Sequence, residues 1–111
     1  MAHFPKVHPS IRAPRTRFTN PEPVDFRVEN QLQKGRLLRL SMTGGCAIMD
    51  KEIRRGTLAQ IEIPTPLGRI RALIEFLDIH PKATRPELGF RFVGLEDVDH
   101  ERLGKALQKF G

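Results

Sequence analysis

The sequence contains no tryptophan, no tyrosine and only one cysteine among its 111 residues. A single cysteine cannot form an intramolecular disulfide, and the first residues show no secretory leader, so we expect a cytoplasmic protein. Cys46 stands between Gly45 and Ala47 and is predicted to be a small core residue rather than a reactive thiol. No run approaches the roughly 18 apolar residues of a membrane-spanning helix, so no transmembrane segment is expected. The length fits one domain.

Residue clusters typical of enzymes and metal sites are also missing. The four histidines are scattered along the chain: His3, His8, His80 and His100. None of them has metal-ligand spacing to another histidine or to the cysteine. Ser41 lacks the Gly-x-Ser-x-Gly context of a nucleophile, and the acidic residues between 96 and 101 are explained by a helix start. We therefore expect a protein that is not an enzyme and that holds no cofactor or metal.

The net charge is positive, and the excess of basic residues lies in the first half of the chain. The chain has a net charge of +6, and residues 1–55 hold 11 Lys and Arg against 5 Asp and Glu, whereas residues 56–111 hold 8 of each. Such a field indicates an anionic partner, which can be a phosphate compound, a nucleic acid or a membrane surface. A general nucleic-acid binder is the less favoured of these, because no Trp or Tyr is present to stack on bases.

The first 23 residues contain five of the nine prolines. Proline fixes φ and removes a backbone donor, so residues 1–23 are predicted to be an extended, flexible and basic arm. From Val24 the pattern changes, because Val24, Phe26 and Val28 alternate with charged residues. This period of two is typical of a half-buried strand. We predict a compact domain over residues 24–111.

The rest of the domain is predicted to be mainly β with one closing helix. Further short strands are expected at about 35–41, 46–49, 58–63, 70–76 and around Phe90 and Phe92. About six antiparallel strands at this spacing indicate a small barrel or sandwich. Four apolar residues near the C-terminus recur at helical spacing: Leu103, Ala106, Leu107 and Phe110. Asp97 and Asp99 are candidates to cap this helix.

The arm carries the first candidate binding feature, the segment Arg12-Ala13-Pro14-Arg15-Thr16-Arg17. Arginine presents a planar fork that grips phosphate with two hydrogen bonds and stacks on flat rings. Arg12, Arg15 and Arg17 are therefore candidate ligands for a phosphorylated compound. The alternative is a solvated basic tail.

The second candidate feature is a predicted strand that runs into a glycine turn, Arg39-Leu40-Ser41-Met42-Thr43-Gly44-Gly45. Glycine permits a positive φ and a close approach of the backbone to a ligand, so Gly44 and Gly45 are candidate site residues beside Arg39 and Ser41. The alternative is an ordinary hairpin turn.

Together these features resemble the PilZ domain, from about Arg12 to Phe110. The family has Arg-x-x-x-Arg on an arm and Asp/Asn-x-Ser-x-x-Gly on a strand, and Ser41 and Gly44 match the Ser and Gly of the second motif. Arg39 stands at the Asp/Asn position, and no two of the arm arginines are four residues apart. The resemblance implies a six-stranded antiparallel β-barrel with a C-terminal helix.

The resemblance also implies a ligand, because many PilZ domains bind the bacterial second messenger cyclic di-GMP. The arm arginines are then implied to hold phosphate and to stack on guanine. Arg39 cannot repeat the acceptor role of Asp or Asn, because its side chain has only donors. The expected function is a stand-alone cyclic di-GMP receptor that acts on an unidentified effector protein. The alternative is a PilZ-like adaptor that has lost the ligand and acts through protein contacts.

Overall fold

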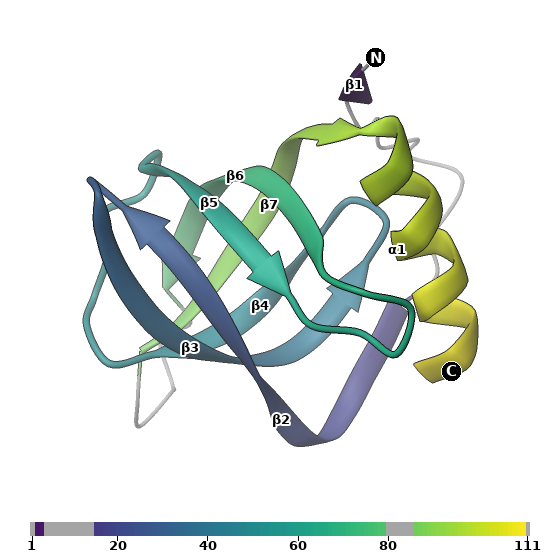
Figure 1. Cartoon of the computed structure of the whole chain (residues 1–111). Helices are drawn as coiled ribbons and strands as arrows, with labels where there is room; N and C mark the ends of the chain where they lie inside the picture. The colour runs from purple at the N-terminus through teal and green to yellow at the C-terminus, as the bar shows by residue number, and fades with distance from the viewer. Residues whose placement is uncertain (1, 4–14, 80–85, 111) are drawn as a thin grey trace, which may run out of the picture.

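The computed structural model describes the backbone of residues 2–3, 15–79 and 86–110, and the side chains within 22–78 and 86–108. This part of the chain contains seven strands and one helix (Figure 1). They are β1 (Ala2–His3), β2 (Arg15–Val28), β3 (Gln31–Ser41), β4 (Gly44–Met49), β5 (Leu58–Ile63), β6 (Ile70–Ile79), β7 (Glu87–Glu96) and α1 (Asp97–Phe110).

The six longer strands close into an antiparallel barrel. Their order is β7-β4-β3-β2-β5-β6, and the pairing of β6 with β7 completes the ring. The two-residue strand β1 adds to the edge of β7, where Ala2 lies opposite Glu96. The predicted six-stranded barrel with a C-terminal helix is confirmed.

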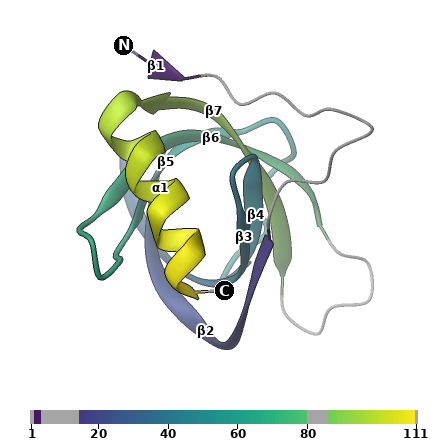
Figure 2. The same ribbon diagram turned by 90° about the vertical axis from the view of Figure 1, so that its right-hand side faces the viewer.

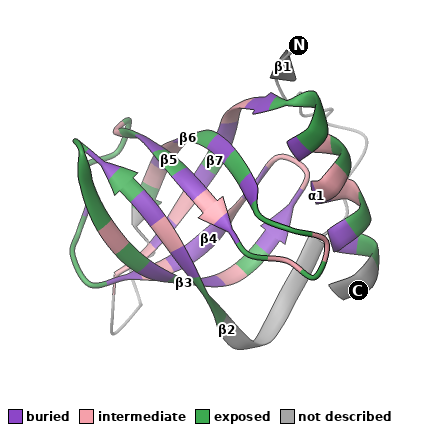
Figure 3. Cartoon of the chain, in the orientation of Figure 1, coloured by how far each residue is buried: buried purple, intermediate pink, exposed green. Residues whose placement is uncertain are grey.

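The core of the barrel follows the period-two pattern of the sequence. Along β6 the side chains of Ile70, Ala72, Ile74 and Phe76 are all buried, and the residues between them face outward (Figure 3). Phenylalanine supplies the aromatic packing, because the ring centroid of Phe76 lies 5.5 Å from that of Phe26. Burial of one Ile or Phe side chain contributes on the order of 1.5–3 kcal/mol, so the buried face of β6 stabilises the closed barrel.

The helix α1 covers one opening of the barrel (Figure 2). Its buried face is formed by Leu103, Ala106 and Leu107, as predicted, whereas the side chain of Phe110 lies outside the described residues. Helix α1 begins at Asp97, so Asp99 lies within its first turn and not at the N-cap position. Its carboxylate is buried and instead accepts a hydrogen bond of 2.9 Å from the backbone N–H of Arg71 on β6.

Strand β2 begins at Arg15, which corrects the predicted start at Val24. The pairing with β3 is interrupted between Arg17 and Glu22, and Pro21 falls inside this irregular stretch. Pro23 lies where β2 has only β3 as a neighbour, because β5 reaches β2 only at residues 25–27. Strand structure tolerates both prolines, because Pro21 lies where the ladder is interrupted and Pro23 has no strand on the β5 side that would need its missing N–H. Residues 4–14 of the predicted arm lie outside the described residues.

Candidate functional site

The pairing of β2 with β3 brings four predicted site residues together. Arg15 is the cross-strand partner of Ser41, and Arg17 is the partner of Arg39. Directly opposed residues in an antiparallel pair have Cβ atoms about 4.5–5.5 Å apart. The third arm arginine, Arg12, lies outside the described residues.

A depression of about 470 Å³ lies beside this pair of strands on the outer surface of the barrel. It is lined by four of the predicted residues, namely Arg39, Ser41, Gly44 and Gly45. Cys46 is the partner of Arg39 on one side and of Gly89 on the other, so these three residues form one row across β3, β4 and β7. Cys46 is buried and Gly89 has no side chain, so no large side chain projects from the middle of the row.

Ser41 holds the turn between β3 and β4. Its hydroxyl donates to the carbonyl oxygen of Gly44 at 3.2 Å and accepts from the backbone N–H of Thr43 at 3.2 Å. The Ser41 side chain is buried, and its hydroxyl satisfies backbone groups of the turn. The Ser-x-x-Gly spacing therefore has a structural role at the rim of the depression.

The two glycines of the turn permit close packing of strands. Neither uses the positive φ that glycine permits, because both lie in β4 and the positive-φ glycines of the described chain are Gly56 and Gly68. A Cβ atom on Gly44 would overlap the carbonyl oxygen of Phe90 on β7. The expected close approach is therefore made by the protein's own backbone.

Charged residues of both signs surround the depression. Arg39 is exposed, and Arg91 from β7 also lines the depression with its Nε beside the carboxylate of Glu75. The acidic lining residues are Asp78 and Glu87. No motif in the sequence marks Arg91 as a site residue, although its position between the buried Phe90 and Phe92 places it on the outer face of β7. The sign of the charge thus differs between parts of the rim.

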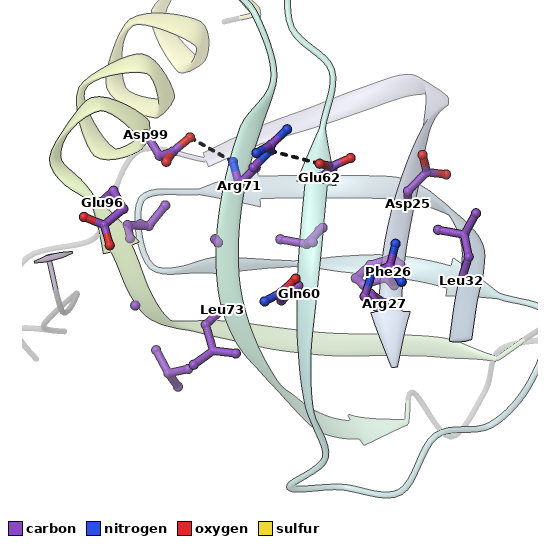
Figure 4. Close-up of a pocket in the computed structure, with 15 residues that line it drawn as sticks. Asp25, Phe26, Arg27, Leu32, Gln60, Glu62, Arg71, Leu73, Glu96 and Asp99 are labelled. Atoms are coloured by element: carbon purple, nitrogen blue, oxygen red, sulfur yellow. Dashed lines mark hydrogen bonds and ion pairs between the residues drawn. The ribbon is translucent and has the colours of Figure 1, made fainter. Parts of the chain in front are cut away.

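A second depression, of about 810 Å³, lies on the outer face of β2, β5, β6 and β7 (Figure 4). It contains none of the predicted site residues. Glu62 in this depression is already paired with Arg71 at 3.0 Å and with Arg69 at 3.2 Å. Leu32 and Leu73, which are labelled in Figure 4, are large hydrophobic residues with exposed side chains. The lining of this depression holds more acidic side chains than arginines, namely Asp25, Glu62, Glu96 and Asp99 against Arg27 and Arg71, so it is less suited to a phosphate ligand.

Other residues singled out from the sequence take ordinary positions. Cys46 is buried and unpaired, and His100 is half-buried in the first turn of α1, whereas His80 lies outside the described residues. Within the described residues no group of three or more metal-ligating side chains occurs. The described residues also include no helix with the length and apolar character needed to cross a membrane.

Comparison with solved structures identifies similar barrels. The PilZ domain of YcgR from Escherichia coli with c-di-GMP is 22% identical, with a TM-score of 0.68 and coverage of 90% of both chains. A crystal structure of Escherichia coli YcgR with c-di-GMP is 25% identical, with a TM-score of 0.69 over 89% of this chain and 45% of that chain. The Bacillus subtilis inhibitor of motility, MotI/DgrA, is 13% identical, with a TM-score of 0.71 over 94% of this chain and 52% of that chain.

This chain therefore spans about half the length of those two longer chains. No curated protein matches it. The model of the PilZ domain matches residues 11–109, which include the whole barrel and almost all of α1. This chain belongs to the PilZ domain family.

Proposed function

We propose that this PilZ domain binds cyclic di-GMP in the depression of about 470 Å³. The observation that carries the proposal is the register that sets Arg15 opposite Ser41 and Arg17 opposite Arg39 at its rim. Several arginines beside an open depression suit a ligand that carries phosphates. The structures of Escherichia coli YcgR with c-di-GMP support the same ligand class.

The arm supplies the phosphate contacts in this proposal. Arg12, Arg15 and Arg17 hold the two phosphates of the ligand through paired N–H donors, and they stack on its guanine rings. No proton transfer or covalent step is needed, so the proposed protein is a receptor rather than an enzyme.

The strand residues supply the rest of the site. Arg39 has only donors, and it therefore contacts the O6 and N7 acceptors of guanine, the edge that arginine fits best. Ser41 keeps the turn in place through its bonds to Thr43 and Gly44. Gly44 and Gly45 let β4 pack closely against β7 and β3, which fixes the position of the turn beside the ligand.

Binding is transmitted to an effector protein through the arm. Docking of the part of the arm that precedes β2 over the ligand changes the surface that a partner meets, which is a common form of molecular switch. Because a second messenger acts inside the cell, the proposal also places the protein in the cytoplasm.

A PilZ-like adaptor without ligand is the second candidate function. The observation that favours it is Arg39, which replaces the acceptor of the family motif with a donor-only cation. In this case the barrel acts through protein contacts alone.

Equilibrium titration with labelled cyclic di-GMP tests the proposal, with GTP and a homopolymer RNA as competitors. We expect saturable binding that unlabelled cyclic di-GMP displaces and GTP does not. A two-phosphate ligand releases few counterions, so the affinity should change only weakly with salt, by roughly one or two units of log–log slope. If cyclic di-GMP does not bind, the adaptor function is favoured instead. If RNA alone binds, with an affinity that falls steeply with salt, the protein is a nucleic-acid binder.

A further inference from the structure

The predicted site residues offer no free hydrogen-bond acceptor to a guanine base. The Watson–Crick edge of guanine carries N–H donors, which need acceptors on the protein. Arg39 offers donors only, and the Ser41 hydroxyl already bonds within the turn at 3.2 Å to both Thr43 and Gly44. A guanine in the depression therefore needs an acceptor from another element.

Two carboxylates line the depression, and they differ in availability. Asp78 is paired with Arg55 at 3.5 Å, and its side chain is 75% exposed. Glu87 is half-buried and makes no ion pair or side-chain hydrogen bond with another described residue. A half-buried carboxylate that is not already paired is the better acceptor, because it is partly shielded from competing water.

The strand register places Glu87 at the opposite side of the depression from Arg39. Glu87, Gly89 and Arg91 share the outer face of β7, because Leu88 and Phe90 between them are buried. Gly89 stands in the same cross-strand row as Arg39, two strands away. Glu87 lies two residues further along β7, so the Cα atoms of Arg39 and Glu87 are separated by roughly 12 Å.

The row between them carries no large side chain, because Cys46 is buried and Gly89 has no side chain. A Cβ atom added to Gly89 would meet Leu77 at 3.6 Å, which is ordinary contact, so this glycine is not tightly packed. A planar base lying beside Gly89 in the depression meets a donor on one edge, from Arg39, and an acceptor on the other, from Glu87.

We propose that Glu87 is the residue that selects guanine, by accepting hydrogen bonds from its N1–H and its exocyclic amine. This inference rests on the proposed function, since it assigns a specificity residue to the same site. The carboxylate supplied by the family motif is thus replaced by one from β7, while Arg39 reads the opposite edge of the base.

The test compares cyclic di-GMP with cyclic di-IMP, whose hypoxanthine bases lack the exocyclic amine, in the wild type and in Glu87→Gln. The amide keeps the shape of the carboxylate but loses its charge and one acceptor. We expect the wild type to prefer cyclic di-GMP by tenfold or more, on the scale of one charge-assisted hydrogen bond. In Glu87→Gln the affinity for cyclic di-GMP should fall by a similar factor, and the preference should shrink towards one.

Glu52→Gln is the matched control, because it makes the same change of charge at an exposed position outside the depression. It should keep both the affinity and the preference. Equal wild-type binding of the two dinucleotides, or an unchanged preference in Glu87→Gln, would overturn this inference and leave the proposed function standing. Binding of neither dinucleotide by the wild type would overturn both.

Discussion

Replacement of Gly44 by alanine tests whether this glycine serves the packing of strands. The added Cβ atom would overlap the Phe90 carbonyl oxygen and lie 2.8 Å from the Cα atom of Arg91, so it meets backbone rather than a flexible side chain. Overpacking of this kind costs about 1–3 kcal/mol. A loss of 1 kcal/mol lowers Tm by about 4–8 °C in a domain of this size. We expect a clear fall in Tm without any ligand present.

Gly89→Ala is the matched control in the same depression. Its added Cβ atom would find Leu77 at 3.6 Å, which is ordinary contact, so the free energy of unfolding should change little. Chemical denaturation of both variants, followed by circular dichroism, gives the comparison. Equal stability of Gly44→Ala and the wild type would refute the reasoning, because β4 and β7 would then separate at no cost.

Three further predictions concern the helix, its tie to β6 and the strand motif. Gly104→Ala should raise the free energy of unfolding by roughly 0.5–1 kcal/mol, because alanine favours a helix interior and Met42 lies 4.0 Å from the added Cβ atom; a lower Tm would contradict this. Asp99→Ala should cost about 1–3 kcal/mol, since it leaves the N–H of Arg71 without its acceptor, and a neutral effect in denaturant unfolding would disprove that role. Arg39→Asp should weaken cyclic di-GMP binding by roughly tenfold or more, the scale of one charge-assisted hydrogen bond. If the wild type does not bind cyclic di-GMP and Arg39→Asp does, the result would instead support the adaptor function.

The strands and the helix could be predicted because their signals are local, whereas the pattern left a barrel or a sandwich open and the closed barrel was implied by the resemblance to PilZ domains. Alternation at Ile70, Ala72, Ile74 and Phe76 is visible in consecutive residues, and each of these side chains is buried. The helix over 97–110 follows from apolar residues three and four apart. The local pattern did not reveal that β2 begins at Arg15, because the prolines indicated an irregular arm and the strand accommodates Pro21 where its pairing is interrupted.

The site could be predicted only in part, because it depends on register. The sequence singled out Arg17 and Arg39 separately, but their pairing requires the shift between Arg17 and Glu22 in the β2–β3 ladder. Glu87 and Arg91 come from β7, and they join the depression only through the pairing of β7 with β4. No local pattern reports which strands become neighbours across such a distance.

Titration of ¹⁵N-labelled protein with cyclic di-GMP, followed by amide chemical shifts, tests the central claim most directly. The account predicts saturable shifts at residues 39–46 and 87–91, which surround the depression of about 470 Å³. The amides of Gln60 and Leu73, in the depression on the other face, should stay unchanged. No shifts at saturating dinucleotide, or shifts confined to the face around Gln60 and Leu73, would contradict it.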